Sequence, residues 1–482
     1  MINFSDLTFI FRFLPVFLIA FFLTPTRYRK VTLFVGSLLF YAVGDLKMFP
    51  VLLGAIIINF LFAKALRGSN NKLLFGFIIV LDALMLIEFK LLGQFVDNSF
   101  LPVGISFFTF KMISFQVDNY RADISKEPKF IDVAAYFCMF PQVVSGPIMR
   151  YSDFEKNVFF KKNDSELEVI DLDDENADEM LEEKEVDNFA DKKNNFAGIL
   201  EAIEDGLRYF VVGLGMKVLL ADHLAMLWKD IGTIGYESVS TPLAWLGAVA
   251  YSLELYFDFW GYSLMAAGVG MMIGFPFIVN FDQPYKSKNV GEFYRRWHAT
   301  LGSWFRDYIY IPMGGSRKGD KRTVLNLLVV WLITGFWHGV TLNFILWGVS
   351  IFIIIFCEKY LLKKLPEMTS AVIGRINVLV LIPLTWVIFA ISDSTMLADY
   401  FMRLFPFFGA GIAVNEGDFA KNLGMYWPVL LSGLLLLVPQ IFELFEKYKK
   451  KPVFTVLLLI LFWACIYSLS NAAGNPFMYF RF

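Results

Sequence analysis

Long apolar runs alternate with short charged segments along the 482 residues of this chain. Many runs reach the roughly 20 residues that an α-helix needs to cross the hydrocarbon core of a bilayer. The pattern predicts membrane helices at the following positions: 7–24, 31–44, 48–66, 73–92, 101–118, 130–148, 206–228, 242–277, 324–349, 351–362, 373–392, 426–445 and 453–470. We therefore expect an all-α, polytopic integral membrane protein with about 11–13 spans.

Two of these runs do not fit a simple span. The run at 242–277 is too long for one perpendicular helix, so we expect a break near Gly261 or two shorter helices. The run at 101–118 begins with Pro102 and Gly104, which weaken a helix, and it is a candidate re-entrant segment. Re-entrant backbone persists at membrane depth only where protein or a wet cavity surrounds it.

The composition supports this class. The chain is 57% hydrophobic, against about 45–50% in soluble globular domains. The excess lies in the long runs, which argues against a soluble multidomain protein with core helices of roughly 10–14 residues. The first run is followed by basic residues without a small-residue cleavage site, so we interpret it as a span rather than a cleavable signal. The three cysteines are isolated and indicate neither a disulfide framework nor a metal cluster.

The net charge of −2 hides a strong asymmetry. Residues 164–191 contain fourteen acidic residues and one lysine, a charge of −13, so the rest of the chain carries +11. We expect the segment 163–195 to be a disordered, solvated loop inserted in a single membrane domain of residues 1–482, with a partner-binding segment as the alternative.

The lysines and arginines predict the orientation. They cluster at 27–30, 64–72, 121–129, 359–364 and 447–451. Because such clusters stay on the cytoplasmic side, this pattern places both termini outside the cytoplasm.

Two of the three histidines stand directly after a tryptophan within residues 292–343. They are His298, after Trp297, and His338, after Trp337. A titratable imidazole in an apolar setting is costly, so it is by default a hypothesis of a functional site. His223 follows an apolar run without a comparable setting, and we interpret it as structural.

His298 lies in a segment that is too polar to cross lipid. Trp297 and Trp304 are seven residues apart and would share one face of a helix. The arginines of the segment, Arg295, Arg296 and Arg306, fit either an interfacial belt at the headgroups or a site for the phosphates of an anionic acyl donor.

His338 lies in a span without charged residues. Gly335 and Gly339 would leave backbone space beside its ring for a substrate, and Asn343 offers a polar partner. An imidazole buried without a partner is held neutral, which is the form that a general base needs. The alternative is a structural histidine bonded to a carbonyl of a neighbouring helix.

Two further groups carry chemistry. Glu254 and Asp258 are one helical turn apart in an apolar run, so they either carry protons or ions or anchor arginines of the 295–306 segment, and we favour the anchor. Asp82, Glu88 and Asp118 invite the same interpretation. Tyr479, near the end of the sequence, is a phenol that is competent to accept an acyl group, unless the aromatic tail simply packs at the outer interface.

The sequence lacks the signatures of other site classes. It contains no HExxH and no paired Cys/His spacing, and the basic turn at 314–319 lacks the spacing of a phosphate-binding loop. We therefore expect no metal, no tightly bound cofactor and no nucleic-acid partner.

Six stretches resemble the membrane-bound O-acyltransferase family, and within it the bacterial branch of alginate O-acetylation and teichoic-acid D-alanyl transfer. The stretches are PVGISFFTFKMISFQVDNYR (102–121), FPQVVSGPIMRYSDF (140–154), YFDFWGYS (256–263), EFYRRWHATLGSWFRDYIYIPMGGSRKG (292–319), GFWHGV (335–340) and FMYFRF (477–482). The YIPMGG part is closer to the acetylating members. The acidic loop departs from the family pattern and adds no motif.

The resemblance implies a ring of helices around a narrow passage with His338 at its centre and His298 as a second histidine. It further implies an acyl donor that enters from the cytoplasm, relay of the acyl group through Tyr479, and a separate extracytoplasmic acetyltransferase that loads a polysaccharide.

We therefore expect acetyl-CoA as the donor substrate. His338 would be the general base toward the accepting hydroxyl, and His298 would orient the donor or stabilise the oxyanion. The expected substrate-binding residues are Arg295, Arg296, Trp297, Trp304, Arg306, Trp337 and Asn343. The alternatives are D-alanyl transfer from a carrier-protein thioester, or a proton-coupled transporter or flippase that uses Glu254 and Asp258.

Overall fold

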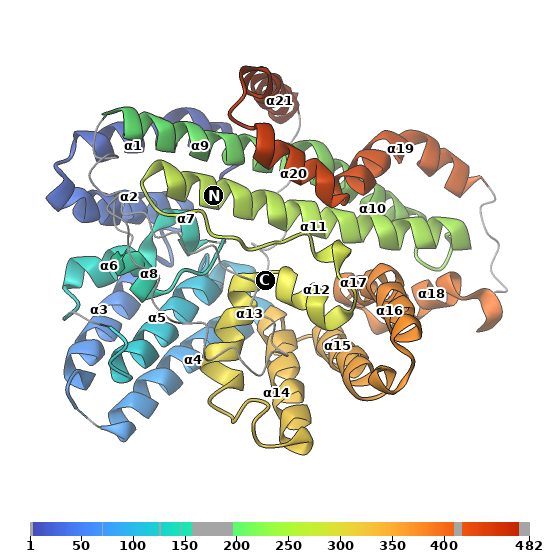
Figure 1. Cartoon of the computed structure of the whole chain (residues 1–482), viewed down its shortest axis with the longest axis horizontal. Coiled ribbons are helices and arrows are strands. Elements are labelled where there is room, and N and C mark those ends of the chain that lie inside the picture. Colours follow the sequence, from blue (N-terminus) through green and yellow to red (C-terminus); the bar gives the residue numbers. More distant parts are fainter. Residues whose placement is uncertain are drawn as a thin grey trace. The chain divides into compact units, whose positions relative to one another are not determined.

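The computed structural model describes residues 3–69, 71–124, 127–144, 146–156, 196–408 and 417–471. Its regular elements within these ranges are helices, as Figure 1 shows. The prediction of an all-α polytopic membrane protein is confirmed. The acidic loop at 163–195 and the tail with Tyr479 lie outside the described residues.

Six described helical segments are long and apolar enough to cross a membrane. A seventh is counted if α19 (Asp418–Leu436) and α20 (Pro439–Tyr448), which meet at a bend of 73°, form one broken span. This number is below the expected about 11–13 spans, because several apolar runs form short or broken helices. The run at 130–148, for example, folds as α6 (Phe130–Cys138) and the four-residue α7 (Phe140–Val143).

The helices form two compact units, each built from separate parts of the chain. Unit 1 comprises Met1–Gly213 and Tyr262–Asn280, and unit 2 comprises Leu214–Gly261 and Phe281–Phe482. The chain passes from unit 1 to unit 2 within α9 (Phe196–Gly215), returns to unit 1 within α11 (Thr241–Met272), and enters unit 2 again between Asn280 and Phe281. The predicted break near Gly261 is wrong, since α11 is one helix of 32 residues. Its middle is buried throughout, and this packing overrides the weak helix propensity of a single glycine.

Unit 1 has an aromatic core that follows from the phenylalanine-rich sequence. The ring of Phe140 lies 4.8 Å from that of Phe17 and 5.2 Å from that of Phe13. The α-helices of this unit are α1 (Leu14–Leu23), α2 (Arg29–Gly44), α3 (Phe49–Leu66), α4 (Lys72–Phe95), α5 (Ile105–Tyr120), α6, α7, α8 (Tyr151–Lys156), most of α9 and the end of α11.

A polar cluster links three helices of unit 1. The amide of Gln116 on α5 donates to the side-chain oxygen of Asn59 on α3 at 2.9 Å, and the amide of Asn59 donates to Asp82 on α4 at 2.9 Å. All three side chains are buried. Asp82 is therefore a structural anchor, but its partner is an amide rather than an arginine.

Most of the run at 101–118 forms one helix, which Pro102 and Gly104 precede rather than interrupt, and its re-entrant character stays a prediction. α5 begins at Ile105, and together with the preceding turn it is one of the segments long enough to span. Gly104, with φ of 68°, supplies the left-handed start. A Cβ at this position would lie 1.9 Å from the carbonyl oxygen of Val143, so only glycine allows this approach.

Unit 2 contains the tryptophan–histidine pairs and the last spans. Its further helices are η4 (Met216–Ala221), α10 (Asp222–Ile234), α12 (Val290–Arg296), α13 (Ala299–Phe305), η6 (Arg306–Tyr310), α14 (Asp320–His338), α15 (Leu342–Tyr360), α16 (Glu367–Ile376), η8 (Asn377–Leu381), α17 (Ile382–Ala390), α18 (Ser394–Leu404), α19, α20 and α21 (Pro452–Asn471).

Small residues bring α14 and α15 together, and the two helices run side by side in Figure 1. A Cβ at Gly335 would lie 2.5 Å from the carbonyl oxygen of Phe344, and one at Gly348 would lie 2.4 Å from that of Trp331. Close backbone approach at small residues is typical of packed membrane helices. The predicted single span at 324–349 is therefore wrong, because the chain turns between His338 and Leu342.

Candidate active site

His338 is the last residue of α14, at the turn that leads into α15. Its side chain is 6% exposed. Aromatic rings surround the imidazole, with centroid distances of 4.4 Å to Trp337, 5.1 Å to Trp347 and 5.0 Å to Phe389. These rings enclose the imidazole on the side of α14, α15 and α17.

The space beside His338 differs from the prediction. A Cβ at Gly339 would lie 2.4 Å from the ring of Phe344, and the backbone face of Gly335 meets the carbonyl of the same residue. The expectation that these glycines leave room for a substrate is wrong, because α15 fills that room. Their role is to let α15 approach α14 at the histidine.

Asn343 holds the start of α15 in place. Its amide donates to the carbonyl oxygen of Phe389 at 2.9 Å, and its side-chain oxygen accepts from the hydroxyl of Thr341 at 2.6 Å. Phe389 in turn packs against the ring of His338. Asn343 thus supports one wall of the histidine site, and a direct contact with substrate stays a prediction.

His298 lies between two short helices rather than within one. α12 ends at Arg296 and α13 begins at Ala299, and His298 has φ of 48° and ψ of 50°. This left-handed conformation is sparsely populated for residues other than glycine and occurs often at functional sites. The carbonyl of His298 accepts the first hydrogen bonds of α13, from Leu301 and Gly302 at 3.0 Å.

The predicted single helix through Trp297 and Trp304 is therefore wrong. Trp297 forms an isolated antiparallel bridge with Phe281, and the N–H of Asp282 donates to the carbonyl of Arg296 at 3.0 Å. This pairing draws Trp297 into an extended conformation and ends the helix. Both tryptophans are buried, but Trp297 follows the end of α12 whereas Trp304 lies within α13.

The imidazole of His298 is 4% exposed. It packs perpendicular to Phe259 at 4.7 Å and lies 6.5 Å from Phe281. This burial lowers the pKa of His298 from its ordinary 6.5 to about 3. The ring is therefore neutral at physiological pH, and an interfacial position in contact with headgroups does not fit it.

Aromatic packing connects the surroundings of the two histidines within unit 2. Trp347, which contacts His338, stacks on Trp386 at 5.6 Å. Trp386 contacts Trp297 at 5.0 Å, and Trp297 directly precedes His298. The structure thus joins the two Trp-His pairs through contacts among the aromatic rings of Trp347, Trp386 and Trp297.

The arginines near His298 are engaged in ion pairs within the chain. Arg296 donates to Glu292 at 2.8 Å and pairs with Asp282, while Arg306 pairs with Asp307 at 2.7 Å. A role of these arginines toward a phosphate-bearing donor stays a prediction. Trp304, also predicted to bind substrate, packs on Phe305 and Tyr308.

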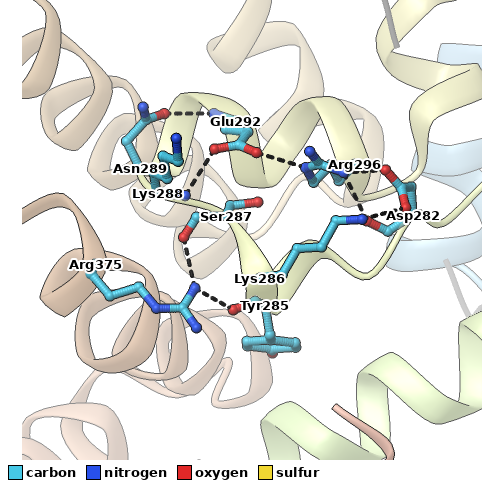
Figure 2. A network of polar contacts seen from close by, with 9 residues as sticks. All are labelled: Asp282, Tyr285, Lys286, Ser287, Lys288, Asn289, Glu292, Arg296 and Arg375. Carbon is cyan, nitrogen blue, oxygen red and sulfur yellow. Dashed lines mark hydrogen bonds and ion pairs between the residues drawn. The ribbon is translucent and has the colours of Figure 1, made fainter. Parts of the chain in front are cut away.

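Figure 2 shows the polar network that holds the loop before α12. Arg375 of α16 donates to the carbonyls of Tyr285 and Ser287 at 2.7 and 2.8 Å. Glu358 of α15 accepts from the N–H of Val290 at 2.9 Å, at the start of α12. Sequence reasoning missed both charged residues, because neither lies near the loop in the sequence.

The buried acids of α11 have a different partner from the one predicted. The ammonium group of Lys217 lies 2.8 Å from Asp258 and 2.7 Å from Asp222. Lys217 and Asp258 are almost fully buried, as is Glu254 one turn away on α11. Asp258 is an anchor, but for a lysine of η4 and not for an arginine of the 295–306 segment.

Comparisons with known proteins agree with these features. The family model of the membrane-bound O-acyltransferases matches residues 26–392. The chain is 32% identical to a probable alginate O-acetylase AlgI of Pseudomonas putida, over 99% of this chain and 100% of the relative. It is 31% identical to a peptidoglycan O-acetyltransferase of Helicobacter pylori, over 72% and 68% of the two chains. It is 28% identical to a teichoic acid D-alanyltransferase of Bacillus subtilis, over 54% and 60%.

Proposed function

This chain belongs to the membrane-bound O-acyltransferase family, and on that premise we propose that it passes an acetyl group from cytoplasmic acetyl-CoA across the membrane for O-acetylation of an extracytoplasmic polysaccharide. It is a multi-pass membrane enzyme, an O-acyltransferase. The match that carries the proposal is the one to the alginate O-acetylase, which spans both chains almost completely. The D-alanyltransferase match covers about half of this chain, which favours acetyl over D-alanyl.

We assign the general base to His338. Its neutral imidazole would take the proton of the accepting hydroxyl while the hydroxyl oxygen attacks the carbonyl carbon of the thioester. The CoA thiolate that leaves would then take this proton from the imidazolium. Base catalysis of this kind contributes typically about 10²–10⁴ in rate. What supports the assignment is the burial of His338 among rings at the end of α14.

We assign His298 to the donor or to the oxyanion. The ring stays neutral because burial lowers its pKa, so it can donate one hydrogen bond without carrying charge. The exposed basic residues of the turn before α14 and of its first turn would attract the phosphates of CoA at the cytoplasmic mouth, aided by Arg295, Arg296 and Arg306. They are Arg317, Lys318, Lys321 and Arg322.

We place the accepting phenol at Tyr479. The resemblance of the tail to the family supports this choice. The chemistry supports it as well, because an aryl ester is a better acyl donor than an alkyl ester. A separate extracytoplasmic acetyltransferase would then move the acetyl group from Tyr479 to the polysaccharide. The enzyme would lie in the cytoplasmic membrane with both termini outside, as the lysine and arginine clusters predict.

The test uses membranes that contain the full-length protein and radiolabelled acetyl-CoA. The wild-type protein should become labelled, and label should be absent from the His338→Ala and Tyr479→Phe variants. A His223→Ala variant, altered at a histidine outside the proposed site, serves as the matched control and should be labelled normally.

Three results would speak against this function. Unchanged polysaccharide acetylation in cells that carry either site variant would exclude the relay. Labelling from a D-alanyl carrier-protein thioester, but not from acetyl-CoA, would identify the D-alanyl branch. Gradient-dependent flux without an acyl product would indicate a transporter.

A further inference from the structure

The indole of Trp347 is the group beside His338 that the proposed mechanism leaves without a task. Trp347 lies on α15 and is 2% exposed. Its ring stands perpendicular to that of His338 at 5.1 Å and stacks on Trp386 at 5.6 Å. Two further rings pack on this indole, Phe389 at 5.3 Å and Trp331 at 6.0 Å.

The N–H of this indole is a buried donor. Within the described ranges, which end at residue 471, the Nε1–H of Trp347 makes no hydrogen bond. A buried tryptophan N–H normally finds a partner, because an unpaired donor in an apolar environment loses the hydrogen bond that it made with water. An unsatisfied donor in contact with a proposed general base points to an acceptor that arrives with the substrate.

We propose that the indole N–H of Trp347 donates a hydrogen bond to the carbonyl oxygen of the acyl group while it reacts at His338. The inference rests on the proposed acyl transfer and adds a catalytic residue to it. When the hydroxyl oxygen bonds to the thioester carbon and its proton goes to His338, an electron pair moves from the C=O bond to the carbonyl oxygen. The indole N–H stabilises this oxyanion. The pair then re-forms the C=O bond, the C–S bond breaks, and the thiolate takes the proton from the imidazolium.

The surroundings make such a donor effective. Rings of low polarity enclose the indole, so water does not compete for the developing oxyanion and the donor needs no reorientation. Rigidity comes from the close contact of Gly348 with the carbonyl of Trp331, which holds this part of α15 against α14.

The test compares two tryptophan-to-phenylalanine variants in membranes with labelled acetyl-CoA. Trp347→Phe should lower kcat by about 10²–10³, the effect of removing one oxyanion donor, with KM for acetyl-CoA changed only a few-fold. Trp331→Phe removes an indole that packs on the same ring and should retain a kcat near that of the wild type. A kcat of Trp347→Phe near the wild-type value would overturn the proposal.

A second replacement separates the N–H from the shape of the ring. A 3-benzothienylalanine at position 347 keeps the bicyclic shape, and therefore the packing, but has sulfur in place of N–H. It should lose activity like Trp347→Phe, and full activity would overturn the proposal. If the wild-type protein transfers no acetyl group, the proposed function falls and this inference with it, whereas an active wild type with an equally active benzothienyl variant removes the inference alone.

Discussion

At the scale of single residues, His298 combines a buried imidazole with a left-handed backbone. Burial lowers its pKa from 6.5 to about 3, so the folded protein keeps the ring neutral where the unfolded chain would take up a proton. Above pH 6.5 this difference between the folded and unfolded chain costs no stability. As the pH falls from 6.5 toward about 3, the unfolded chain binds the proton and the free energy of unfolding decreases. For one such group the free energy of unfolding changes by about 1.4 kcal/mol per pH unit in this range.

This linkage predicts a difference between the wild type and His298→Gln, which cannot take up the proton. Between pH 6.5 and 3 the wild type should lose stability more steeply than the variant, as measured by unfolding of the detergent-solubilised protein. His223→Gln serves as a control for the loss of a histidine elsewhere in unit 2. Parallel stability curves for the wild type and His298→Gln would show that His298 titrates normally.

At the scale of elements, the packing of α14 on α15 determines where His338 and Trp347 meet. Gly335 lies against the carbonyl of Phe344, and Gly348 lies against that of Trp331. A methyl group at either glycine must push the helices apart, since the contacted atoms are backbone and cannot rotate away. Overpacking of this kind costs about 1–3 kcal/mol.

We therefore expect Gly335→Ala to lower both the melting temperature and the rate of acetyl transfer. Gly76→Ala is the matched control, because Gly76 lies within α4 and a Cβ there would have no neighbour within 4 Å. The control should be neutral or slightly stabilising, because alanine has the higher helix propensity. Thermal unfolding and label incorporation measure the two effects, and an active, stable Gly335→Ala would contradict the packing argument.

The segment that carries His298 is likewise shaped by its neighbours. Asp282 and Arg296 close the loop at its base, and Arg375 and Glu358 hold it from two other helices. These contacts explain why a stretch with helical spacing of its tryptophans does not form one helix. The spacing of the tryptophans predicted a helix that continues through Trp297, but the pairing of Trp297 with Phe281 ends α12 before this residue.

At the scale of the whole molecule, each unit is held together by buried polar side chains as well as by apolar packing. In unit 2 the ammonium of Lys217 connects η4 with α10 and α11 through Asp222 and Asp258. In unit 1 an amide network connects α3, α4 and α5. The buried charges around Lys217 need one another, because removing one of them leaves the opposite charge buried without a partner.

Lys217→Met should accordingly destabilise the protein by about 3–5 kcal/mol, because two carboxylates lose their cation. Lys217→Arg keeps the charge and should retain much of the stability. The double variant Lys217→Met with Asp258→Asn should recover part of the loss. Yield of folded protein in detergent and its thermal midpoint are the measurements, and a fully stable Lys217→Met would show that the pair is not structural.

The sequence by itself determined the structural class of the molecule and, through its family motifs, the class of its reaction. Apolar runs identify membrane helices because hydropathy is a local property, and the Trp-His pairs at 297–298 and 337–338 stand out because imidazoles are rare in this chain. The stretches around them resemble the family to which the chain belongs. These features need no knowledge of contacts between distant residues.

The tertiary structure alone decided where the helices end and which groups meet. The turn after His338, the left-handed His298 and the closed space beside Gly335 all depend on contacts with other segments. The partners of the charges also come from distant positions, as Lys217 with Asp258 shows. The physical reason is that hydropathy and spacing describe the neighbours of a residue along the chain, whereas burial and pairing depend on its neighbours in space.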